Sequence, residues 1–364
     1  MIFVSTKEIT IRKFLLPLII KYLNEYNNAI IICNNSSKLK DLNELRRYKN
    51  IKYYDVNFPI IIKDIINPYK LIKIILKLRK ILNLHNTKII TNTPIASHFV
   101  RIALLFQKRK IIYFVHGFRF YNFLKLIHYL IFFAIELLLS IKVHSYITIN
   151  KNDYKFSKKI FRKKSILVNG VGLDLNKLKK FDNKLKFIKQ NPIKILVIGA
   201  YKLEKGYMDV VNLLNKSKSN NLMISCFGYG DYNKFKQKIR KEKINYIQFN
   251  NFSENIYSEY CNNHILLVPS RREGLSVTIM EGMFIGIPII ATNVRGCKDL
   301  INNNINGYTY QPGDIKKIEF ILKDYKKNYN KVQNLTKKAK DDAIKKFDSK
   351  IISNQIIQFI NNDH

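Results

Sequence analysis

Short runs of β-branched and aliphatic residues recur along the first half of the chain, and segments with helical spacing separate them. The expected strands are Met1–Ser5, Ala29–Cys33, Ile51–Val56, Lys88–Thr91, Lys110–Val115, Tyr146–Ile149 and Ser165–Val168. The expected helices between them are Ile11–Glu25, Tyr69–Leu82 and His98–Phe106. Short buried strands that alternate with helices are typical of a parallel sheet covered by helices on both faces.

The alternation pauses at the charged segment Leu178–Asn191 and then starts again, which indicates a linker between two domains. The second set of expected strands is Lys194–Ala200, Leu222–Gly228, Ile244–Phe249, His264–Ser270 and Ile287–Thr292, with a helix at Met208–Lys216. A chain of 364 residues suits two domains of roughly 150–200 residues each. We therefore expect an N-terminal domain over 1–185, a second domain over 186–345, and a C-terminal helix over 346–364 that packs back on the first domain.

The fold class that this pattern predicts is α/β, with two consecutive doubly wound, Rossmann-like domains. The tail Asn334–Asn362 is expected to be helical. In such folds ligands bind at the carboxyl ends of the strands, so we expect the site in a central cleft that the two domains face.

The charge of the chain is strongly positive, with 64 Lys and Arg against 26 Asp and Glu and a net charge of +38. This balance indicates an anionic partner, which could be nucleic acid, a phosphorylated substrate or an acidic lipid surface. An AT-rich genome, which favours Lys, Ile and Asn codons, is the competing explanation and accounts for roughly half of the excess.

Nothing in the sequence predicts a membrane span or a secretory leader. The most apolar stretch, Tyr129–Ile141, is short and contains Glu136, and the N-terminus has no basic segment ahead of an apolar one. The 4 cysteines show no CxxC spacing, which favours reduced thiols. A cytoplasmic protein is expected.

Two carboxylates mark the strongest motif, SRREGLSVTIMEGMFIGIPIIAT. Glu273 falls in the loop after an expected strand, and Glu281 falls inside the helix VTIMEGMFI, which Gly286 ends. The free amides of Gly274–Val277 and the helix dipole favour a pyrophosphate at this point. With the phosphates held by these amides, the two carboxylates are suited to accept hydrogen bonds from hydroxyl groups. Glu281 is placed to bind a vicinal diol. A helix-terminal charge and a solvated glutamate are the structural alternative.

Two further residues are candidates for contact with substrate. Lys205, in IGAYKLEKG, precedes a glycine that opens a helix and is well placed for a phosphate, although a solvated lysine is the alternative reading. His116 directly follows the expected strand KIIYFV. A lone histidine is most often a packing residue, but its place at the carboxyl end of a strand favours substrate contact.

The pattern strand-PSxxEGxxxxxxE-helix-GxPxxAT, with GxxxxxKG upstream, resembles the retaining glycosyltransferases of family 4. These enzymes have the two-domain GT-B fold. The likeness extends over most of the chain, and further stretches are similar to the bacterial capsule, exopolysaccharide and O-antigen subgroup, which uses UDP-N-acetylhexosamines and related UDP-sugars. These stretches are TNTPIASHFVRIA, YFVHGFRFYNF, ITINKNDY, VNGVGLD and NVRGCKDLINNNINGYTY.

The resemblance implies a role for each candidate. Glu273 would contact the hydroxyls of the donor sugar and His116 the transferred sugar, as the two catalytic residues. Lys205 would bind the diphosphate, Glu281 the ribose diol, and the backbone of Gly274, Leu275 and Ser276 would assist. The chain departs from the family at three places, the first of which is the loop STKEITIRK, where a Gly-Gly is missing. Many members carry Arg where this chain has Ala200, so Lys205, alone or with Lys202, would neutralise the charge of the phosphates. Asn92 stands where the subgroup has the histidine of an HTP motif, and we assign it no role.

The expected function is transfer of a hexose or N-acetylhexosamine from a UDP-sugar to a glycan, with retention of the anomeric configuration. The chain has no Asp-x-Asp motif, and we expect helix amides and lysine, rather than a metal ion or another cofactor, to neutralise the leaving diphosphate. The expected acceptor is a polyprenyl-diphosphate-linked glycan, which implies peripheral association with anionic lipid of the inner leaflet.

Two alternatives stay open at this point. A GT-B sugar-nucleotide epimerase or hydrolase would use the same fold and donor without an acceptor. A basic nucleic-acid-binding protein would account for the charge, but no RNP, KH, zinc-finger or helix-turn-helix signature supports it, so no nucleic-acid partner is expected.

Overall fold

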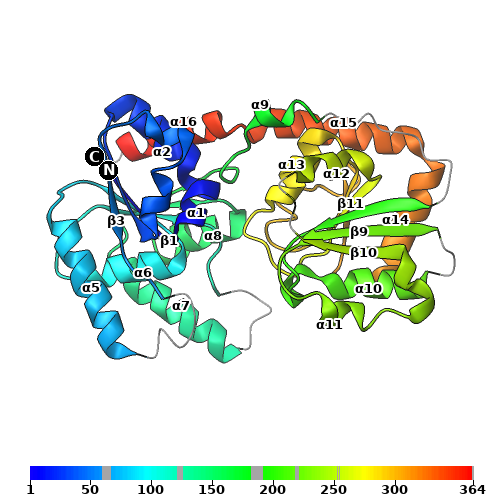
Figure 1. The fold of residues 1–364 in the computed structure, drawn as a ribbon, viewed down its shortest axis with the longest axis horizontal. Coiled ribbons are helices and arrows are strands. Elements are labelled where there is room, and N and C mark those ends of the chain that lie inside the picture. The colour runs from blue at the N-terminus through cyan, green and yellow to red at the C-terminus, as the bar shows by residue number, and fades with distance from the viewer. Residues whose placement is uncertain are drawn as a thin grey trace. The chain divides into compact units, whose positions relative to one another are not determined.

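The computed structural model describes residues 1–59, 67–120, 126–181, 192–217, 221–251, 253 and 255–362. The chain forms two compact units, one made of Met1–Gly172 with Ser349–His364 and the other of Leu173–Asp348 (Figure 1). The linker expected at Leu178–Asn191 falls largely on residues 182–191, so the expected boundary after residue 185 lies outside the described residues.

The first unit contains a seven-stranded sheet in the order β3-β2-β1-β4-β5-β6-β7, and the paired strands are all parallel. Its strands are β1 (Ile2–Lys7), β2 (Ala29–Asn34), β3 (Ile51–Asp55), β4 (Ile89–Asn92), β5 (Ile111–Val115), β6 (Ser145–Thr148) and β7 (Lys164–Leu167). The order steps outward from β1 in both directions, and β1, β2, β4, β5 and β6 are buried almost throughout. Both faces of this sheet are therefore covered.

Helices cover the two faces of this sheet. They are α1 (Glu8–Thr10), α2 (Leu16–Tyr26), α3 (Asn43–Arg46), α5 (Pro68–Asn83), α6 (Pro94–Ala103), α7 (Leu126–Ser140), α8 (Lys151–Lys155) and α16 (Ser349–Asn361). Within this unit Figure 1 shows α2 and α16 on one side of the strands and α5, α6 and α7 on the other. Helix α16 packs against α2, and Lys88 Nζ donates to the carbonyl of Ile360 at 2.6 Å.

The second unit repeats the plan with a six-stranded parallel sheet in the order β10-β9-β8-β11-β12-β13. Its strands are β8 (Ile193–Ile198), β9 (Leu222–Gly228), β10 (Ile247–Asn251), β11 (Ile265–Val268), β12 (Ile289–Thr292) and β13 (Tyr308–Tyr310). Its helices are α9 (Leu175–Leu178), α10 (Tyr207–Lys216), α11 (Asn233–Lys236), α12 (Ile256–Asn262), α13 (Val277–Ile285), α14 (Ile315–Lys327) and α15 (Tyr329–Lys346).

Successive side chains of the central strand β8 pack into different hydrophobic cores, because side chains along a strand point alternately to the two faces of the sheet. Ile195 belongs to the apolar cluster that includes residues of α10 and α14, and Leu196 belongs to the cluster that includes residues of α13. The two doubly wound sheets confirm the fold class predicted from the sequence.

The chain passes between the units at two adjacent points. The amide of Leu173 donates to the carbonyl of Phe347 at 2.7 Å inside the second unit. In the first unit Gly172 has φ +79°, and a Cβ there would lie 2.3 Å from Cα of Ser349. A side chain at position 172 would therefore collide with the start of α16.

Several expected elements differ in their limits. The helix expected at His98–Phe106 is α6 and begins at Pro94, whose missing amide suits the first turn of a helix. Residues 244–246 belong to the 3₁₀ turn Lys241–Tyr246, so the strand expected from Ile244 starts at Ile247. The helical tail is interrupted between α15 and α16, and β13 and α14 were not predicted.

Across the described ranges, no helix combines the length and the apolar content that a bilayer crossing requires. Helix α7, which contains most of the apolar stretch singled out in the sequence, has 15 residues and includes Glu136.

Candidate active site

Glu273 lies in the loop that connects β11 to α13 in the second unit, as the sequence predicted. The helix begins after Ser276, whose Oγ accepts a hydrogen bond from the amide of Ile279 at 3.4 Å. It ends at Gly286, whose φ of 88° lies in the left-handed region that favours glycine. This local strand, loop and helix bring Glu273 to the carboxyl end of the sheet, where ligands bind in such folds.

Lys205 and Glu273 meet, although 68 positions separate them in the chain. Lys205 Nζ donates to Glu273 Oε1 at 2.7 Å, and Ser270 Oγ donates to the same oxygen at 2.7 Å. The Glu273 side chain is 14% exposed and that of Lys205 33% exposed. The cation predicted for phosphate and the carboxylate predicted for sugar hydroxyls therefore form a partly buried pair that solvent can still reach.

Two glycines permit the close backbone approaches on which this arrangement depends. Gly206, directly after Lys205, has φ +74°, and a Cβ there would lie 1.7 Å from the carbonyl oxygen of Pro269. Gly296 has φ +84°, and its Cβ would lie 2.7 Å from the carbonyl oxygen of Gly274. Any larger residue at either place would push the loops that hold Lys205 and Glu273 apart.

Asp209 ties the Glu273 loop to the rest of the unit and was not predicted from the sequence. It is almost fully buried on α10 and accepts hydrogen bonds from Arg271, from Tyr310 Oη at 3.2 Å and from the amide of Gly313 at 3.0 Å. Because Arg271 lies two positions before Glu273, this buried ion pair restrains the loop that carries the candidate carboxylate.

Gly274, Leu275 and Ser276 join Glu273 to the helix. Ser276 is buried and caps α13, and Leu275 packs against the apolar cluster under that helix. The side chains of Leu275 and Ser276 therefore have structural roles. The backbone amides at the start of α13 are the groups that a phosphate can use.

Glu281 lies in the second turn of α13, and two tyrosines of α12 hold its carboxylate. Tyr260 Oη donates to Glu281 Oε2 at 2.7 Å, and Tyr257 Oη lies 3.4 Å from Glu281 Oε1. Burial, followed by the nearby Glu281 carboxylate, raises the pKa of both phenols. Both tyrosines therefore stay protonated and can fix the orientation of the carboxylate that the sequence assigned to the ribose. Their spacing of three positions on a helix is the only sequence signal that pointed to them.

His116 follows β5 in the first unit, at the carboxyl end of that sheet. Its ring is partly exposed and lies between Phe14 and Phe114, with ring centroids 5.1 and 4.5 Å away. Burial lowers the pKa of His116 from 6.5 to about 4. The imidazole is therefore neutral near pH 7 and can offer a hydrogen bond but not a charge.

Asn92, to which the sequence assigned no role, contacts His116 directly. Its Nδ2 lies 2.6 Å from His116 Nε2, its side chain is fully buried, and Oδ1 has no hydrogen-bond partner in the described part of the chain. The next residue, Thr93, has φ +70°, an unusual value for a β-branched residue. Asn92 is therefore a positioning residue that fixes the ring and the tautomer of His116.

Over the described ranges, no group of three or more His, Cys, Asp or Glu side chains has a geometry that could hold a metal ion. None of the four cysteines, all of which lie in the described ranges, forms a disulfide, and burial raises the pKa of Cys33 to about 12.

Comparison with known proteins identifies the family to which the range around Lys205, Glu273 and Glu281 is similar. Residues 179–342 match the family described as Glycosyl transferases group 1. That range contains the Lys205–Glu273 pair, Glu281 and α13. The matched range belongs to this group, and the chain is a glycosyltransferase.

Relatives of this glycosyltransferase extend the likeness beyond the second unit. An uncharacterized 41.2 kDa protein in the cps region of Klebsiella pneumoniae is 26% identical over 243 residues, 64% of this chain and 67% of that protein. The capsular polysaccharide biosynthesis glycosyltransferase CapM of Staphylococcus aureus is 25% identical over 332 residues, 84% and 83% of the two chains. The N,N'-diacetylbacillosaminyl-diphospho-undecaprenol alpha-1,3-N-acetylgalactosaminyltransferase of Campylobacter jejuni is 25% identical over 232 residues, 59% of each.

Among solved structures, HepE of Anabaena in complex with UDP and glucose superposes on this glycosyltransferase with a TM-score of 0.76. The match covers 99% of both chains at 16% sequence identity, a level that establishes the fold. Both units of the chain therefore have the GT-B architecture.

Proposed function

We propose that this glycosyltransferase moves a hexose or N-acetylhexosamine from a UDP-sugar to a lipid-linked glycan in surface polysaccharide biosynthesis, with retention of the anomeric configuration. The observation that carries the proposal is the meeting of Lys205 and Glu273 beside the N-terminus of α13. A cation, helix amides and a carboxylate gathered at one point match the diphosphate and the sugar hydroxyls of such a donor.

When the donor binds, Lys205 and Glu273 give up their contact with each other and contact the donor instead. The diphosphate takes the place of Glu273 as the acceptor for Lys205, and the amides at the start of α13 bind the remaining phosphate oxygens. Glu273 then accepts hydrogen bonds from the donor sugar. Glu281, oriented by Tyr260, accepts from the two ribose hydroxyls, and the neutral His116 contacts the transferred sugar.

In the transfer step the bond between the anomeric carbon and the β-phosphate oxygen breaks, and a bond from that carbon to the acceptor oxygen forms on the same face. The leaving phosphate oxygen takes the proton of the acceptor hydroxyl, so no protein carboxylate has to act as the general base. Lys205 and the helix amides stabilise the negative charge that develops on UDP, and a metal ion is not needed for that task.

The names of the relatives support the biological setting. CapM acts in capsular polysaccharide biosynthesis, and the Campylobacter jejuni relative extends a sugar carried on diphospho-undecaprenol. A HepE structure contains UDP-glucose. A lipid-linked acceptor places the reaction at the inner leaflet of the membrane, where anionic lipid is the natural contact surface for a chain with a net charge of +38.

A donor panel tests the proposal. Purified protein is incubated with UDP-glucose, UDP-galactose, UDP-N-acetylglucosamine or UDP-N-acetylgalactosamine, with and without a polyprenyl-diphosphate-linked glycan, and released UDP is measured. One of these donors should release UDP only when acceptor is present. Equal release of UDP without acceptor would instead identify a hydrolase, and conversion of the donor into another UDP-sugar without acceptor would identify an epimerase.

A further inference from the structure

Helix α7 in the first unit buries two polar residues and leaves most of its aliphatic residues exposed, while its aromatic residues Tyr129, Phe132 and Phe133 pack against an apolar cluster. The residues that it buries are Glu136 and Ser140. The exposed ones include Leu126, Ile127, Leu130, Ile131, Leu137 and Leu138, whose exposed fractions lie between 41% and 73%. A helix at the surface of a protein in water normally shows the reverse pattern.

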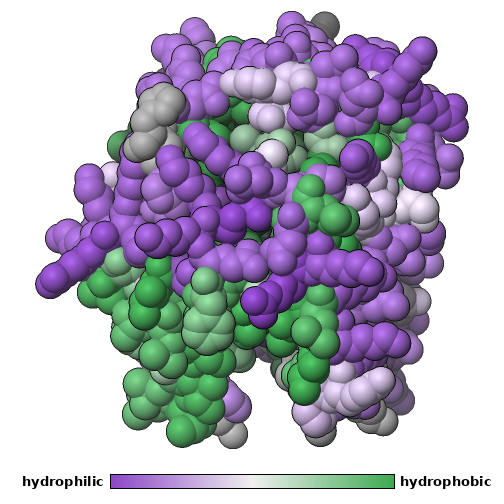
Figure 2. Space-filling view, turned by 90° about the vertical axis from the view of Figure 1, so that its left-hand side faces the viewer, coloured by the Kyte–Doolittle hydropathy of each residue, from purple (hydrophilic) through white to green (hydrophobic). Residues whose placement is uncertain are grey.

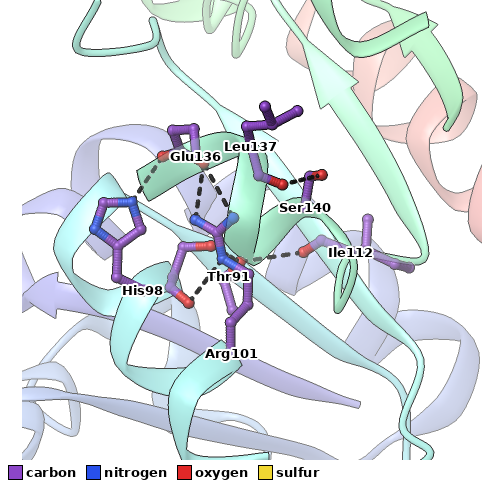
Figure 3. A network of polar contacts seen from close by, with 8 residues as sticks. Thr91, His98, Arg101, Ile112, Glu136, Leu137 and Ser140 are labelled. Carbon is purple, nitrogen blue, oxygen red and sulfur yellow. Dashed lines mark hydrogen bonds and ion pairs between the residues drawn. The ribbon is translucent and has the colours of Figure 1, made fainter. Parts of the chain in front are cut away.

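A buried polar network fixes this orientation (Figure 3). Glu136 Oε2 accepts from both terminal nitrogens of Arg101 at 3.0 Å, and Glu136 Oε1 lies 2.8 Å from His98 Nε2. Burial alone would raise the pKa of Glu136, but Arg101 and His98 outweigh it and lower that pKa to about 2. Rotation of α7 would leave the buried guanidinium unpaired, so its apolar face has to point outward.

The apolar surface continues beyond the helix. Leu105 and Phe106, which follow α6, are 44% and 89% exposed, and Ile141 at the end of α7 is 74% exposed. Helix α7 lies along the lower edge of the first unit in Figure 1, and Figure 2 shows a broad hydrophobic area along the lower part of the molecule. A contiguous exposed apolar area of this kind marks an interaction site.

A basic depression adjoins this surface at the C-terminal end of α7. Its lining residues are Gln107, Lys108, Arg109, Ile141, Lys142, Val143, His144 and Lys163. Ile141 belongs to both the depression and the apolar surface, so the two are continuous. None of the lining side chains is a carboxylate; Lys142 Nζ donates to the carbonyl of Gln107 at 2.8 Å, and Lys163 Nζ to that of Ile141 at 3.4 Å.

We propose that the outward face of α7 inserts into an anionic lipid surface and that the basic depression binds lipid phosphates at its edge. Apolar side chains bordered by cations match the order of acyl chains and phosphate groups at the boundary of a membrane leaflet. A second copy of this chain fits less well, because it would bring an identical set of cations against the first. The inference concerns how the chain binds a membrane and does not depend on the identity of the donor.

A single introduced tryptophan reports insertion directly, because the chain contains 0 Trp. The Leu138→Trp protein is mixed with vesicles of phosphatidylglycerol and phosphatidylcholine. Its emission should shift to the blue and be quenched by brominated acyl chains. The matched control is Phe320→Trp on α14 of the second unit, a site that is 62% exposed and should show neither change. Unshifted and unquenched emission from the Leu138→Trp protein would overturn the proposal.

Co-sedimentation tests the charge contribution. Lys142→Gln with Lys163→Gln should weaken binding to vesicles that contain phosphatidylglycerol by about tenfold. The control pair Lys236→Gln with Lys238→Gln, on exposed residues of the second unit, should change it little. Binding of the parent should fall as salt is added. Equal binding to vesicles of pure phosphatidylcholine would contradict a role for the basic depression.

Two further measurements separate this inference from the proposed function and from self-association. UDP affinity and turnover on a short soluble acceptor should be unchanged in Leu138→Gln with Ile141→Gln, while vesicle binding falls by about tenfold. Sedimentation velocity without lipid should give the same monomer for the parent and this variant. A parent dimer that the variant abolishes would show that a second copy covers α7 and would overturn the lipid proposal.

Discussion

Lys205 Nζ and Glu273 Oε1 lie 2.7 Å apart, so the cation proposed to bind the diphosphate and the carboxylate proposed to bind the donor sugar are partners of each other. Lys205→Met should abolish UDP binding, because it removes the cation and leaves a carboxylate beside the diphosphate site. Glu273→Gln should retain UDP affinity but lose transfer by about a hundredfold or more. Calorimetric titration of UDP and single-turnover assays measure the two effects. Equal loss of UDP affinity in both variants would contradict the separate roles.

Glu281 and Tyr260 should act as one unit in UDP binding. Glu281→Gln removes an ionised acceptor and should weaken UDP binding by about 1–3 kcal/mol. Tyr260→Phe should give a smaller loss in the same direction, because Tyr260 only orients the carboxylate. The double variant should be no weaker than Glu281→Gln alone, since the tyrosine acts through the glutamate. Titration of UDP is sufficient because it contains the ribose. An unchanged UDP affinity in Glu281→Gln would show that Glu281 does not bind the ribose.

Activity should survive EDTA. In the proposed mechanism, Lys205 and the amides at the start of α13 supply the positive field at the diphosphate. Transfer rates are compared before and after treatment with EDTA and gel filtration, and again after Mg²⁺ or Mn²⁺ is added. Complete loss that either ion restores would show that the charge on the leaving UDP is neutralised by a metal.

The stability of the protein should depend on His116 in mildly acidic solution. The pKa of His116 is about 4 in the folded chain against 6.5 without the surrounding structure, so the unfolded chain binds the extra proton between these values. The stabilising contribution is therefore complete above about pH 6.5 and is lost as the pH falls toward about 4. Urea unfolding of the parent and of His116→Asn should diverge over this window. Parallel curves would show that the folded structure does not lower the pKa of His116.

How much of the structure could be predicted from the sequence depends on how far apart in the chain the interacting residues lie. The strand, loop and helix around Glu273 depend on neighbours, such as the capping by Ser276 and the stop at Gly286, and could be read directly. The partners of Asp209, by contrast, include Tyr310, which lies 101 positions away and is brought close only by the sheet.

Two other features were hidden for physical reasons. The contact between Asn92 and His116 arises because β4 and β5 are neighbours in the sheet, which the sequence pattern does not specify. In α7, the outward apolar face could not be assigned until Arg101 was seen to hold Glu136 inward. Hydrophobic periodicity assumes that apolar residues face a core, and the exposed aliphatic residues of α7 violate that assumption.

The anomeric configuration of the product tests the central claim most directly. The donor that is consumed in the UDP-release assay, in which the sugar is α-linked to UDP, is followed by proton NMR during transfer to the acceptor. Retention through the Lys205–Glu273 site predicts that the new glycosidic bond is α and that Glu273→Gln forms it far more slowly. A β-linked product, or an α-linked product formed at the parent rate by Glu273→Gln, would contradict the account.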